Sequence, residues 1–414
     1  MALRILIVHN RYRFRGGEDT VVSTECDLLR AFGHLVEEYF ESNDSPFGIL
    51  DALEPIWSFR SDQRLREAIE KFKPDVVHCH NIHYRISPSV YWLCWQLGVP
   101  VVQTLHNYRI GCLNARHSLN GAPCELCLTR RLKQGHGIVR ACFQQSRIRS
   151  AGLAFSLSLH RHLGTFADRV SKYIALSQFA RTKHVLAGIP EGKIVVKPNC
   201  VYPDPGEKSE AGSFCFFAGR LEVDKGVRVL LQAAAFIPDI PIVIAGDGPL
   251  QSEVRDAAST LRNIQYLGPL SRNKVIELMR SAKLFVFPSL AYENFPMSIA
   301  EAFSIGLPVI TSRCGAAAEI VEDTVNGLHF EPGSAAQLAE RIRGVFSDTE
   351  TVGQMGAAAR LSFEQKYSGQ CTYRALYSIY EELVAKPGHV RSSGRTRTLT
   401  EYATHSITCD NKLG

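Results

Sequence analysis

Short apolar runs rich in Val, Ile and Phe alternate along this chain with longer amphipathic stretches. Such runs are typical of buried strands, and the stretches between them, such as Thr20–Phe32 and Ser87–Leu97, of helices that cover a sheet. The strands expected in the first half are Leu3–Val8, Leu35–Tyr39, Asp75–Cys79, Pro100–His106, Tyr173–Ser177 and Ile194–Lys197. Those expected in the second half are Phe214–Ala218, Pro241–Ala245, Ile264–Leu267, Leu284–Pro288 and Leu307–Thr311. The alternation predicts an α/β fold made of βαβ units around parallel sheets.

The length of 414 residues predicts two domains, because one hydrophobic core seldom supports so long a chain. A stretch rich in Pro, Gly and charge, Asn199–Ser213, is typical of a linker, so we expect domains over 1–198 and 199–369. Apolar residues then repeat at helical spacing and predict a helix over 370–386. The Ser-, Thr- and Arg-rich tail, 387–414, lacks this periodicity and is expected to be disordered.

Composition narrows the class of protein. With 45% hydrophobic and 21% charged residues the chain is globular, and a net charge of +6 is too small for a dedicated nucleic-acid binder. The N-terminus MALRILIVHN lacks the features of a signal peptide, so we expect a cytoplasmic protein whose 12 cysteines are reduced. No run of 18 apolar residues occurs, so any membrane contact is expected to be peripheral.

Two glycines follow the first strand, in HNRYRFRGGEDTVV. Gly16 and Gly17 allow the backbone to approach a ligand where a helix begins, and amides at such a start favour an anion. The alternative is a plain turn. No GxGxxG dinucleotide motif occurs, which argues against a dehydrogenase.

Charged residues follow later strands as well. Arg220 and Lys225, in FAGRLEVDKG, come after a strand end, where a guanidinium fork and an ammonium can neutralise a diphosphate. Glu293 precedes a predicted helix start and Glu301 lies eight residues further on, so both carboxylates can accept hydrogen bonds from vicinal hydroxyls. Taken singly, the two cations could also form a solvated loop pair, and an acidic residue at a helix start could be a dipole partner.

Four motifs occur in order along the chain: GGE after the first strand, GRLEVDKG, IAGDGPL, and ENFPMSIAE with its Glu-x7-Glu spacing. Together they resemble a family 4 glycosyltransferase. The matches run from about His9 to Gly327. The segment TLHNYRIGC, followed by further cysteines, is similar to a bacterial subgroup acting in surface-polysaccharide assembly. The resemblance implies the GT-B fold, two Rossmann-like domains facing across a cleft, with the terminal helix crossing back to the first domain.

The resemblance also implies a reaction, the transfer of a sugar from a nucleotide-sugar donor to a glycan or lipid-linked acceptor, with retention and without a metal. An independent check comes from the sequence, in which no two aspartates lie two positions apart to form a metal-holding D-x-D pair. Fixed cations must then stabilise the leaving diphosphate. By resemblance this role falls to Arg220 and Lys225.

The remaining family roles concern the sugars. The resemblance implies that Glu301 holds the ribose of the donor. It implies that Glu293, with backbone amides around Phe295 and Pro296, binds the transferred sugar. His106, in TLHN, matches the family's first-domain histidine near the reacting centre.

Four cysteines lie close together in the chain: Cys112, Cys124, Cys127 and Cys142. A C-x2-C pair flanked by two more thiols could form a tetrahedral zinc site, with His136 as a substitute ligand. Free thiols are the equal alternative. Four thiolates leave no open coordination position, so a zinc ion here is expected to be structural.

The Cys-rich insertion, about residues 107–170, is also basic. From Leu126 to Ala167 there is no Asp or Glu, and apolar residues interleave with the basic ones in AGLAFSLSLHRHLG. The basic residues are Arg130, Arg131, Lys133, Arg140, Arg147, Arg149 and Arg161. Such a segment favours an anionic membrane surface or a lipid-diphosphate acceptor, and a solvated basic face is the alternative.

Two rival functions remain open at the level of sequence. A GT-B-like nucleotide-sugar epimerase or phosphorylase would use the same donor site and release the sugar to water or to phosphate. A non-catalytic scaffold would use the Cys-rich insertion to bind a partner. The joint presence of Arg220, Lys225, Glu293 and Glu301 favours an enzyme.

Overall fold

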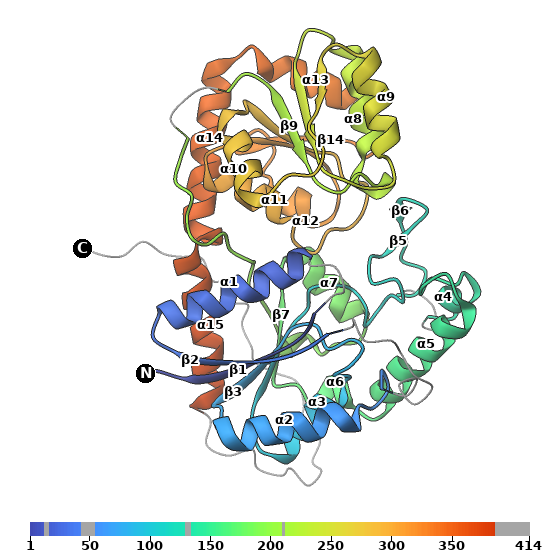
Figure 1. Ribbon diagram of the computed structural model, residues 1–414, viewed down its shortest axis with the longest axis vertical. Helices are drawn as coiled ribbons and strands as arrows, with labels where there is room; N and C mark the ends of the chain where they lie inside the picture. Colours follow the sequence, from blue (N-terminus) through green and yellow to red (C-terminus); the bar gives the residue numbers. More distant parts are fainter. Residues whose placement is uncertain (12–15, 43–53, 129–133, 209–211, 386–414) are drawn as a thin grey trace. The chain divides into compact units, whose positions relative to one another are not determined.

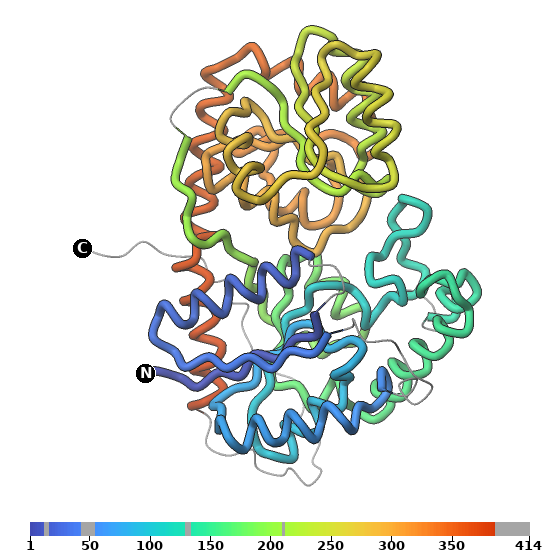
Figure 2. The backbone as a smooth tube through the Cα atoms, viewed as in Figure 1, coloured from blue at the N-terminus to red at the C-terminus, as the bar shows by residue number. Residues whose placement is uncertain are grey.

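The structure is a computed structural model that divides into two compact units (Figures 1 and 2). Among the described residues, the N-terminal unit holds 1–115, 126–197 and 372–385, and the C-terminal unit holds 116–125 and 198–371. The expected tail, 387–414, lies outside the described residues. The structure describes residues 1–11, 16–42, 54–128, 134–208 and 212–385.

A six-stranded parallel sheet forms the centre of the N-terminal unit, in the order β2-β1-β3-β4-β7-β8. Its strands are β1 (Arg4–Arg11), β2 (Leu35–Ser42), β3 (Val76–Cys79), β4 (Val101–Thr104), β7 (Lys172–Ala175) and β8 (Ile194–Val196). All six coincide with strands expected from the apolar runs. Successive strands leave β1 in opposite directions, so the strand order reverses between β1 and β3, and ligands bind beyond the carboxyl ends at such a point.

The helices of this unit follow the βαβ pattern. They are α1 (Gly17–Ala31), α2 (Phe59–Phe72), α3 (Ser89–Gln96), α4 (Gly135–Val139), α5 (Arg147–His162), α6 (Thr165–Asp168), α7 (Gln178–Leu186) and α15 (Gly369–Val384). From Thr372 onward α15 groups with this unit, although the chain reaches it only after the second sheet. Its buried Leu376 and Tyr380 are two of the residues whose spacing predicts the helix.

One part of the Cys-rich insertion does not belong to the N-terminal unit. The hairpin of β5 (Ser118–Leu119) and β6 (Ala122–Pro123) groups with the C-terminal unit. Arg116 anchors it there, with Nη1 3.2 Å from a carboxylate oxygen of Glu222 and 3.4 Å from one of Asp224. The placement of the whole insertion in the first domain is therefore wrong for residues 116–125. Ion pairs formed only in the folded chain leave no pattern in the sequence.

The C-terminal unit contains a second parallel sheet of six strands, in the order β11-β10-β9-β12-β13-β14. Its strands are β9 (Cys215–Ala218), β10 (Ile242–Ala245), β11 (Ile264–Tyr266), β12 (Leu284–Phe287), β13 (Val309–Ser312) and β14 (Gly327–Phe330). This order is that of dinucleotide-binding folds, with its reversal between β9 and β12. The apolar pattern misses β14, because Gly and His occupy two of its four positions. Two parallel-sheet α/β units confirm the expected fold class.

Helices cover this second sheet too. They are α8 (Val227–Phe236), α9 (Gln251–Thr260), α10 (Arg272–Ser281), α11 (Met297–Ser304), α12 (Gly315–Ile320), α13 (Ala335–Phe346) and α14 (Thr349–Ser362). Helix α8 packs on α13, and α11 packs on α14. A core of buried aliphatic residues, with Ile244, Val286 and Ile310 from three strands, holds α8 and α13 against the sheet.

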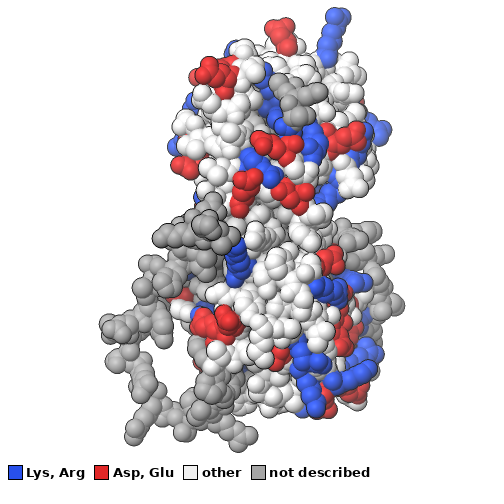
Figure 3. Space-filling view, turned by 90° about the vertical axis from the view of Figure 1, so that its left-hand side faces the viewer, with Lys and Arg blue, Asp and Glu red and all other residues white. Residues whose placement is uncertain are grey.

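Acidic and basic side chains are interspersed on the face shown in Figure 3, without a gathering of one sign. None of the described helices is both long and apolar enough to cross a bilayer. Of the basic residues singled out in the insertion, Arg130, Arg131 and Lys133 lie outside the described residues, whereas Arg140, Arg147 and Arg149 are exposed.

Candidate functional site

The second sheet brings two predicted site residues together at the reversal of its strand order. Lys225 ends a short 3₁₀ turn after β9, and Glu293 lies in the loop after β12. Because β9 and β12 are neighbours, the two loops leave the same edge of the sheet side by side. Leu290 N donates to Asp224 O at 2.7 Å and joins them. This is the edge at which ligands bind in open parallel sheets.

The glycines of GRLEVDKG and IAGDGPL allow their two loops to pack backbone against backbone. Gly246 has φ of 143°, and a Cβ at this position would lie 1.8 Å from the carbonyl oxygen of Gly219. Gly219 N donates to Ala245 O, and Leu221 N donates to Asp247 O, at 3.1 and 2.8 Å. The two motifs therefore form one continuous structure.

Lys225 and Glu293 form a short ion pair between the two loops. Lys225 Nζ lies 2.6 Å from Glu293 Oε1, which also accepts a hydrogen bond from Ser289 Oγ at 3.1 Å. Both side chains are largely buried. Burial alone lowers the pKa of Lys225, but the Glu293 carboxylate outweighs it, so the pKa is raised and the ammonium stays charged.

Arg220 lies at the exposed side of the same loop. Its Nη2 is 2.5 Å from Glu222 Oε1, and its side chain is 66% exposed. Arg116 of the β5–β6 hairpin contacts the other carboxylate oxygen of Glu222 at 3.2 Å. The loop after β9 thus carries alternating charges, with a guanidinium open to solvent and available to an anionic ligand.

Glu301 lies inside α11, as predicted, and is paired with a residue that the motifs do not include. Its Oε1 accepts a hydrogen bond from Arg272 Nε at 2.8 Å. Burial raises the pKa of Glu301, and the Arg272 guanidinium opposes this shift. The carboxylate is 14% exposed and Arg272 is 41% exposed, so a hydroxylated ligand can reach this pair by displacing the arginine.

Phe295 and Pro296 are buried at the start of α11. The Phe295 ring packs against Tyr367, with the ring centroids 5.6 Å apart. Pro296 is the N-cap residue and has no N–H, so hydrogen-bond donors at this start come from its neighbours. The first N–H groups of a helix have no acceptor within the helix and favour an anion or a hydroxyl oxygen.

In the N-terminal unit, helix α1 begins at Gly17 with Gly16 as its N-cap, three residues before the start of the helical pattern at Thr20. Gly16 N donates to Asp19 Oδ2 at 2.8 Å, and Asp19 Oδ1 lies 3.0 Å from His9 Nε2. Burial lowers the pKa of His9, against the effect of Asp19. His9, Asp19 and Arg11 line a cavity of about 230 Å³.

His106 follows β4 and lines a second cavity of about 60 Å³, together with Asn107 and Arg109. Its Nε2 lies 2.8 Å from Nδ1 of His80, and the two rings stack with centroids 5.1 Å apart. Burial and the neighbouring His80 hold the pKa of His106 well below its usual range. The imidazole is therefore neutral near pH 7 and can donate one hydrogen bond and accept another.

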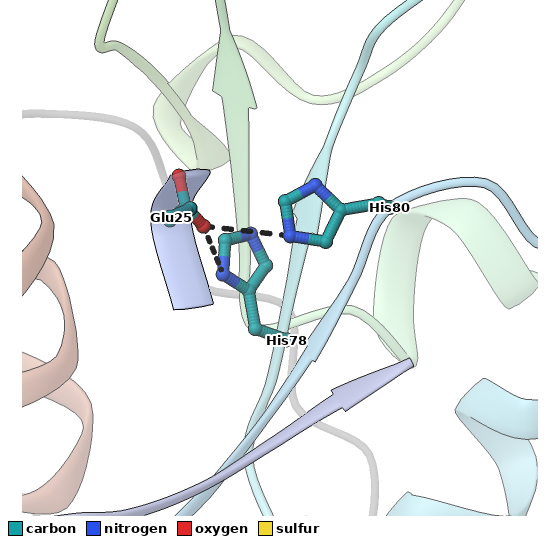
Figure 4. A group of neighbouring side chains, drawn as sticks. All are labelled: Glu25, His78 and His80. Atoms are coloured by element: carbon teal, nitrogen blue, oxygen red, sulfur yellow. Dashed lines mark ion pairs between the residues drawn. The ribbon is translucent and has the colours of Figure 1, made fainter. Parts of the chain in front are cut away.

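Sequence reasoning missed the group of residues behind His106. In Figure 4 the imidazoles of His78 and His80 both turn toward the carboxylate of Glu25. The distances to Glu25 Oε1 are 3.1 Å from His78 Nδ1 and 3.4 Å from His80 Nε2. Histidines at alternate positions of a buried strand lie on one face of its sheet, which was the available signal. Glu25, on α1, carries no comparable signal.

The four cysteines divide between the two units. Cys124 lies in the β5–β6 segment of the C-terminal unit, whereas Cys112, Cys127 and Cys142 lie in the N-terminal unit. The structural zinc site stays a prediction, with an experiment below.

Two family models match the chain in succession. A model described as Glycosyltransferase Family 4 matches residues 16–204, and one described as Glycosyl transferases group 1 matches residues 202–362. The solved structure of Anabaena HepE in complex with UDP aligns at a TM-score of 0.63 and 18% identity, covering 91% of this chain and 99% of that one. The family models define a glycosyltransferase, and its two parallel-sheet units have the GT-B fold.

Characterised relatives agree with this class. The glycogen synthase of Mycobacterium tuberculosis is 26% identical over 327 residues, 77% of this chain and 70% of that protein. The O-antigen chain mannosyltransferase C of Escherichia coli is 29% identical over 176 residues, 42% of this chain and 47% of that protein. The chain belongs to the family 4 glycosyltransferases.

Proposed function

We propose that this enzyme transfers a hexose from a nucleoside-diphosphate sugar to a glycan or lipid-linked acceptor, with retention of configuration and without a catalytic metal. The observation that carries the proposal is the Lys225–Glu293 pair, which the two loops hold at the reversal of the strand order. A donor combines a diphosphate with a hydroxylated sugar. The pair offers a cation for the first and a carboxylate for the second.

The donor site extends from this pair in two directions. Arg220, exposed beside Lys225, adds a second positive charge for the diphosphate. Glu301 and Arg272 offer an acceptor and donors for the ribose hydroxyls. Since HepE is named in complex with UDP, and in another structure with UDP-glucose, a uridine donor is the first to test.

Charge balance supports a reaction that needs no metal. The nucleoside diphosphate gains negative charge as its bond to the anomeric carbon of the sugar breaks, and in this proposal Arg220 and Lys225 supply the fixed positive charge that offsets it. His106 supplies a neutral imidazole to contact a sugar hydroxyl in the same reaction. The proton of the attacking acceptor hydroxyl leaves with the departing phosphate oxygen.

A panel of nucleotide sugars tests the proposal. A bound donor raises the thermal unfolding midpoint according to its affinity, so one donor should stabilise the protein and the others should not. Incubation of that donor with candidate acceptors should yield a product whose anomeric proton coupling matches that of the donor. Free sugar as the main product would indicate a hydrolase and not a transferase. Sugar phosphate would indicate a phosphorylase, and an epimerised sugar would indicate an epimerase. Failure of every donor to bind would favour a scaffold.

The acceptor side of the proposal rests on helix α5. Its exposed residues include Ile148 and Phe155, at 85% and 59% exposure, seven positions apart and so on one face of the helix. Arg147 and Arg149 are exposed beside Ile148, and the surrounding stretch contains no acidic residue. An apolar stripe flanked by arginines matches an anionic lipid surface. The enzyme would then work at the inner face of the cell membrane, on a lipid-linked polysaccharide intermediate.

A further inference from the structure

A buried polar network lies behind His106. Glu25, Lys197, His78 and His80 are all between 0% and 3% exposed. Lys197 Nζ lies 2.8 Å from Glu25 Oε2, whereas the two histidines approach the other carboxylate oxygen, Oε1. The residues come from α1, from β3 and the residue after it, and from the residue after β8, so only the fold brings them together.

Three atoms of this network could hold a metal ion by distance alone. Glu25 Oε1, His78 Nδ1 and His80 Nε2 lie within 4.8 Å of one another. The ammonium of Lys197, however, already neutralises the carboxylate, and a divalent cation beside it would add uncompensated positive charge to a buried site. A hydrogen-bonded chain is therefore the better account of the cluster.

The chemistry of each side chain shows which atoms of this hydrogen-bonded network donate and which accept. A carboxylate only accepts hydrogen bonds and an ammonium only donates them. His80 Nε2 forms no hydrogen bond to any other atom of the described part of the chain, and it lies 3.4 Å from Glu25 Oε1, which is also 3.1 Å from His78 Nδ1. Burial lowers the pKa of His80 to about 3, so this imidazole is neutral and carries one proton. The proton belongs on Nε2, where it meets the carboxylate.

The proton position on His80 in turn decides the proton position on His106. With its proton on Nε2, His80 can only accept at Nδ1. His106 Nε2 lies 2.8 Å from this nitrogen and must donate to it. A neutral His106 that holds its proton on Nε2 has a lone pair on Nδ1.

We propose that Glu25 acts through His80 to fix the tautomer of His106, with the proton on Nε2 and with Nδ1 as an acceptor for a sugar hydroxyl. Glu25 and His80 are positioning residues, since they act on a substrate only through His106. The contact with sugar rests on the proposed function, whereas the tautomer does not. Within the described part of the chain, the contact of His106 Nε2 with His80 Nδ1 is what distinguishes the two neutral forms of His106, and Glu25 sets the proton position on His80.

A second branch of the network gives an internal comparison. His78 Nδ1 lies 2.6 Å from the hydroxyl of Tyr380, and His78 Nε2 lies 2.7 Å from Thr104 Oγ1. This branch shares Glu25 with the first branch and does not include His106. Loss of the Tyr380 hydroxyl should therefore disturb His78 alone.

Glu25→Gln gives a directional test. Lys197 can only donate, so the amide oxygen of the new side chain must face it. The amide NH2 then faces the histidines and has to donate to His80 Nε2. His80 must then carry its proton on Nδ1, and this N–H donates to His106 Nε2. Because His106 Nε2 now accepts, His106 carries its own proton on Nδ1. The substitution should thus reverse the tautomers of both histidines.

Nitrogen-15 NMR of the full chain, labelled at histidine, reads these tautomers directly. His106→Gln identifies the His106 signals by their disappearance. In the wild-type protein we expect a protonated Nε2 and an unprotonated Nδ1 at His106, and in Glu25→Gln the reverse. A wild-type His106 protonated on Nδ1 overturns the proposal even if the variant fails to fold. An unchanged tautomer in a folded Glu25→Gln protein also overturns it.

Tyr380→Phe is the matched control, since it removes one buried hydrogen bond from the same network. Signals of His78 should shift while the His106 tautomer is retained, and a switched His106 would contradict the assigned route. Metal analysis tests the alternative that Glu25, His78 and His80 bind a metal ion. A stoichiometric ion in the wild-type protein that is lost in Glu25→Gln would overturn the hydrogen-bonded network in favour of a metal site.

Activity provides the separate test of the sugar contact. With saturating substrates, kcat of Glu25→Gln should fall roughly tenfold below that of Tyr380→Phe. A switched tautomer with unchanged kcat would refute the contact between His106 and a sugar hydroxyl and leave the tautomer assignment standing. Absence of transferase activity in the wild-type protein would refute the proposed function and leave the NMR result unaffected.

Discussion

Each charged residue of the candidate donor site already has a partner of opposite charge. Lys225 is paired with Glu293, and Glu301 with Arg272. A buried charge without a partner is costly, so these pairs hold the site together until a ligand takes over one side of each. In the proposed function, a diphosphate replaces the carboxylate beside Lys225 and releases Glu293 for a sugar hydroxyl, so that binding exchanges the partners of both charges.

The first prediction concerns the two cations. Arg220→Ala and Lys225→Ala should each lower kcat by roughly 10²–10³, because each removes a group that stabilises charge on the leaving diphosphate. Arg228→Ala is the matched control, since this exposed arginine on α8 pairs only with Glu253, at 2.8 Å, in the part of the chain described. It should retain normal kcat. Near-normal activity in a folded Arg220→Ala/Lys225→Ala protein would refute the assignment.

At residue scale, the sequence indicated which residues belong to the candidate donor site but not which ion-pair partners they have. Strand-end position and residue type made Lys225 and Glu293 candidates, a position inside a predicted helix made Glu301 a third, and only the combined motifs selected all three. Arg272 was not selected, because it lies on α10 and meets Glu301 only when two helices pack together. Glu25 was missed for the same reason.

Among the elements, the turn into α8 shows how backbone shape builds the site. Gly226 has φ of 71°, and a Cβ there would lie 1.8 Å from the carbonyl oxygen of Pro288. This close approach holds the loop after β9 against the end of β12. Lys225 directly precedes the turn, so the turn fixes its position relative to Glu293.

Gly226→Ala should destabilise the C-terminal unit. The left-handed backbone alone costs about 1–2 kcal/mol for alanine, and the overlap with Pro288 adds to it. Gly344→Ala is the control, because Gly344 lies exposed within α13 with no atom within 4 Å of its Cβ position. It should stabilise by about 0.5–1 kcal/mol. Denaturant unfolding followed by circular dichroism measures both, and equal free energies of unfolding would contradict the argument.

The second element with a prediction is the Cys-rich insertion. Protein purified without added zinc should carry about one equivalent if Cys112, Cys124, Cys127 and Cys142 form a structural site. Cys127→Ser should lose the metal, whereas Cys94→Ser, at a buried position of helix α3, should retain it. Brief EDTA treatment should leave transfer unaffected, since the reaction is proposed to need no metal. Four freely titratable thiols in metal-free folded protein would refute the site.

At the scale of the whole molecule, the N-terminal unit collects buried neutral histidines. Burial lowers the pKa of His80 to about 3 and holds those of His83 and His106 well below their usual range. The unfolded chain binds protons at these histidines below about pH 6.5, and the folded chain does not. The contribution of these histidines to the free energy of unfolding is therefore fully present above pH 6.5 and is lost as the pH falls below it. For His80 this loss continues down to about pH 3.

Tryptophan fluorescence can follow this loss, because all 3 tryptophans belong to the N-terminal unit. They are Trp57, Trp92 and Trp95. Between pH 7.5 and 5.5 the fluorescence-monitored midpoint of urea unfolding should decrease, with each histidine contributing up to about 1.4 kcal/mol per pH unit below 6.5. A midpoint that rises or stays constant on acidification would contradict the burial of these groups in their neutral form.

The proposed membrane association also concerns the whole molecule. Anionic vesicles should co-sediment the protein at low salt, release it at high salt, and bind it far better than neutral vesicles. Ile148→Ser/Phe155→Ser should weaken binding. Phe59→Ser is the control, because Phe59 is 77% exposed on helix α2, outside the basic segment. Failure to co-sediment with either anionic or neutral vesicles would favour a soluble acceptor.

The sequence alone determined the fold class and the family, because both depend on local patterns. Apolar runs specify buried strands, and glycines and charges at fixed spacing after those strands specify the donor motifs. The tertiary structure decided which residues meet. The pairing of Lys225 with Glu293 depends on β9 lying beside β12, and the network from Glu25 to His106 depends on α1 packing on the sheet. Such contacts join residues far apart in the chain, and their energies depend on distances that no linear pattern contains.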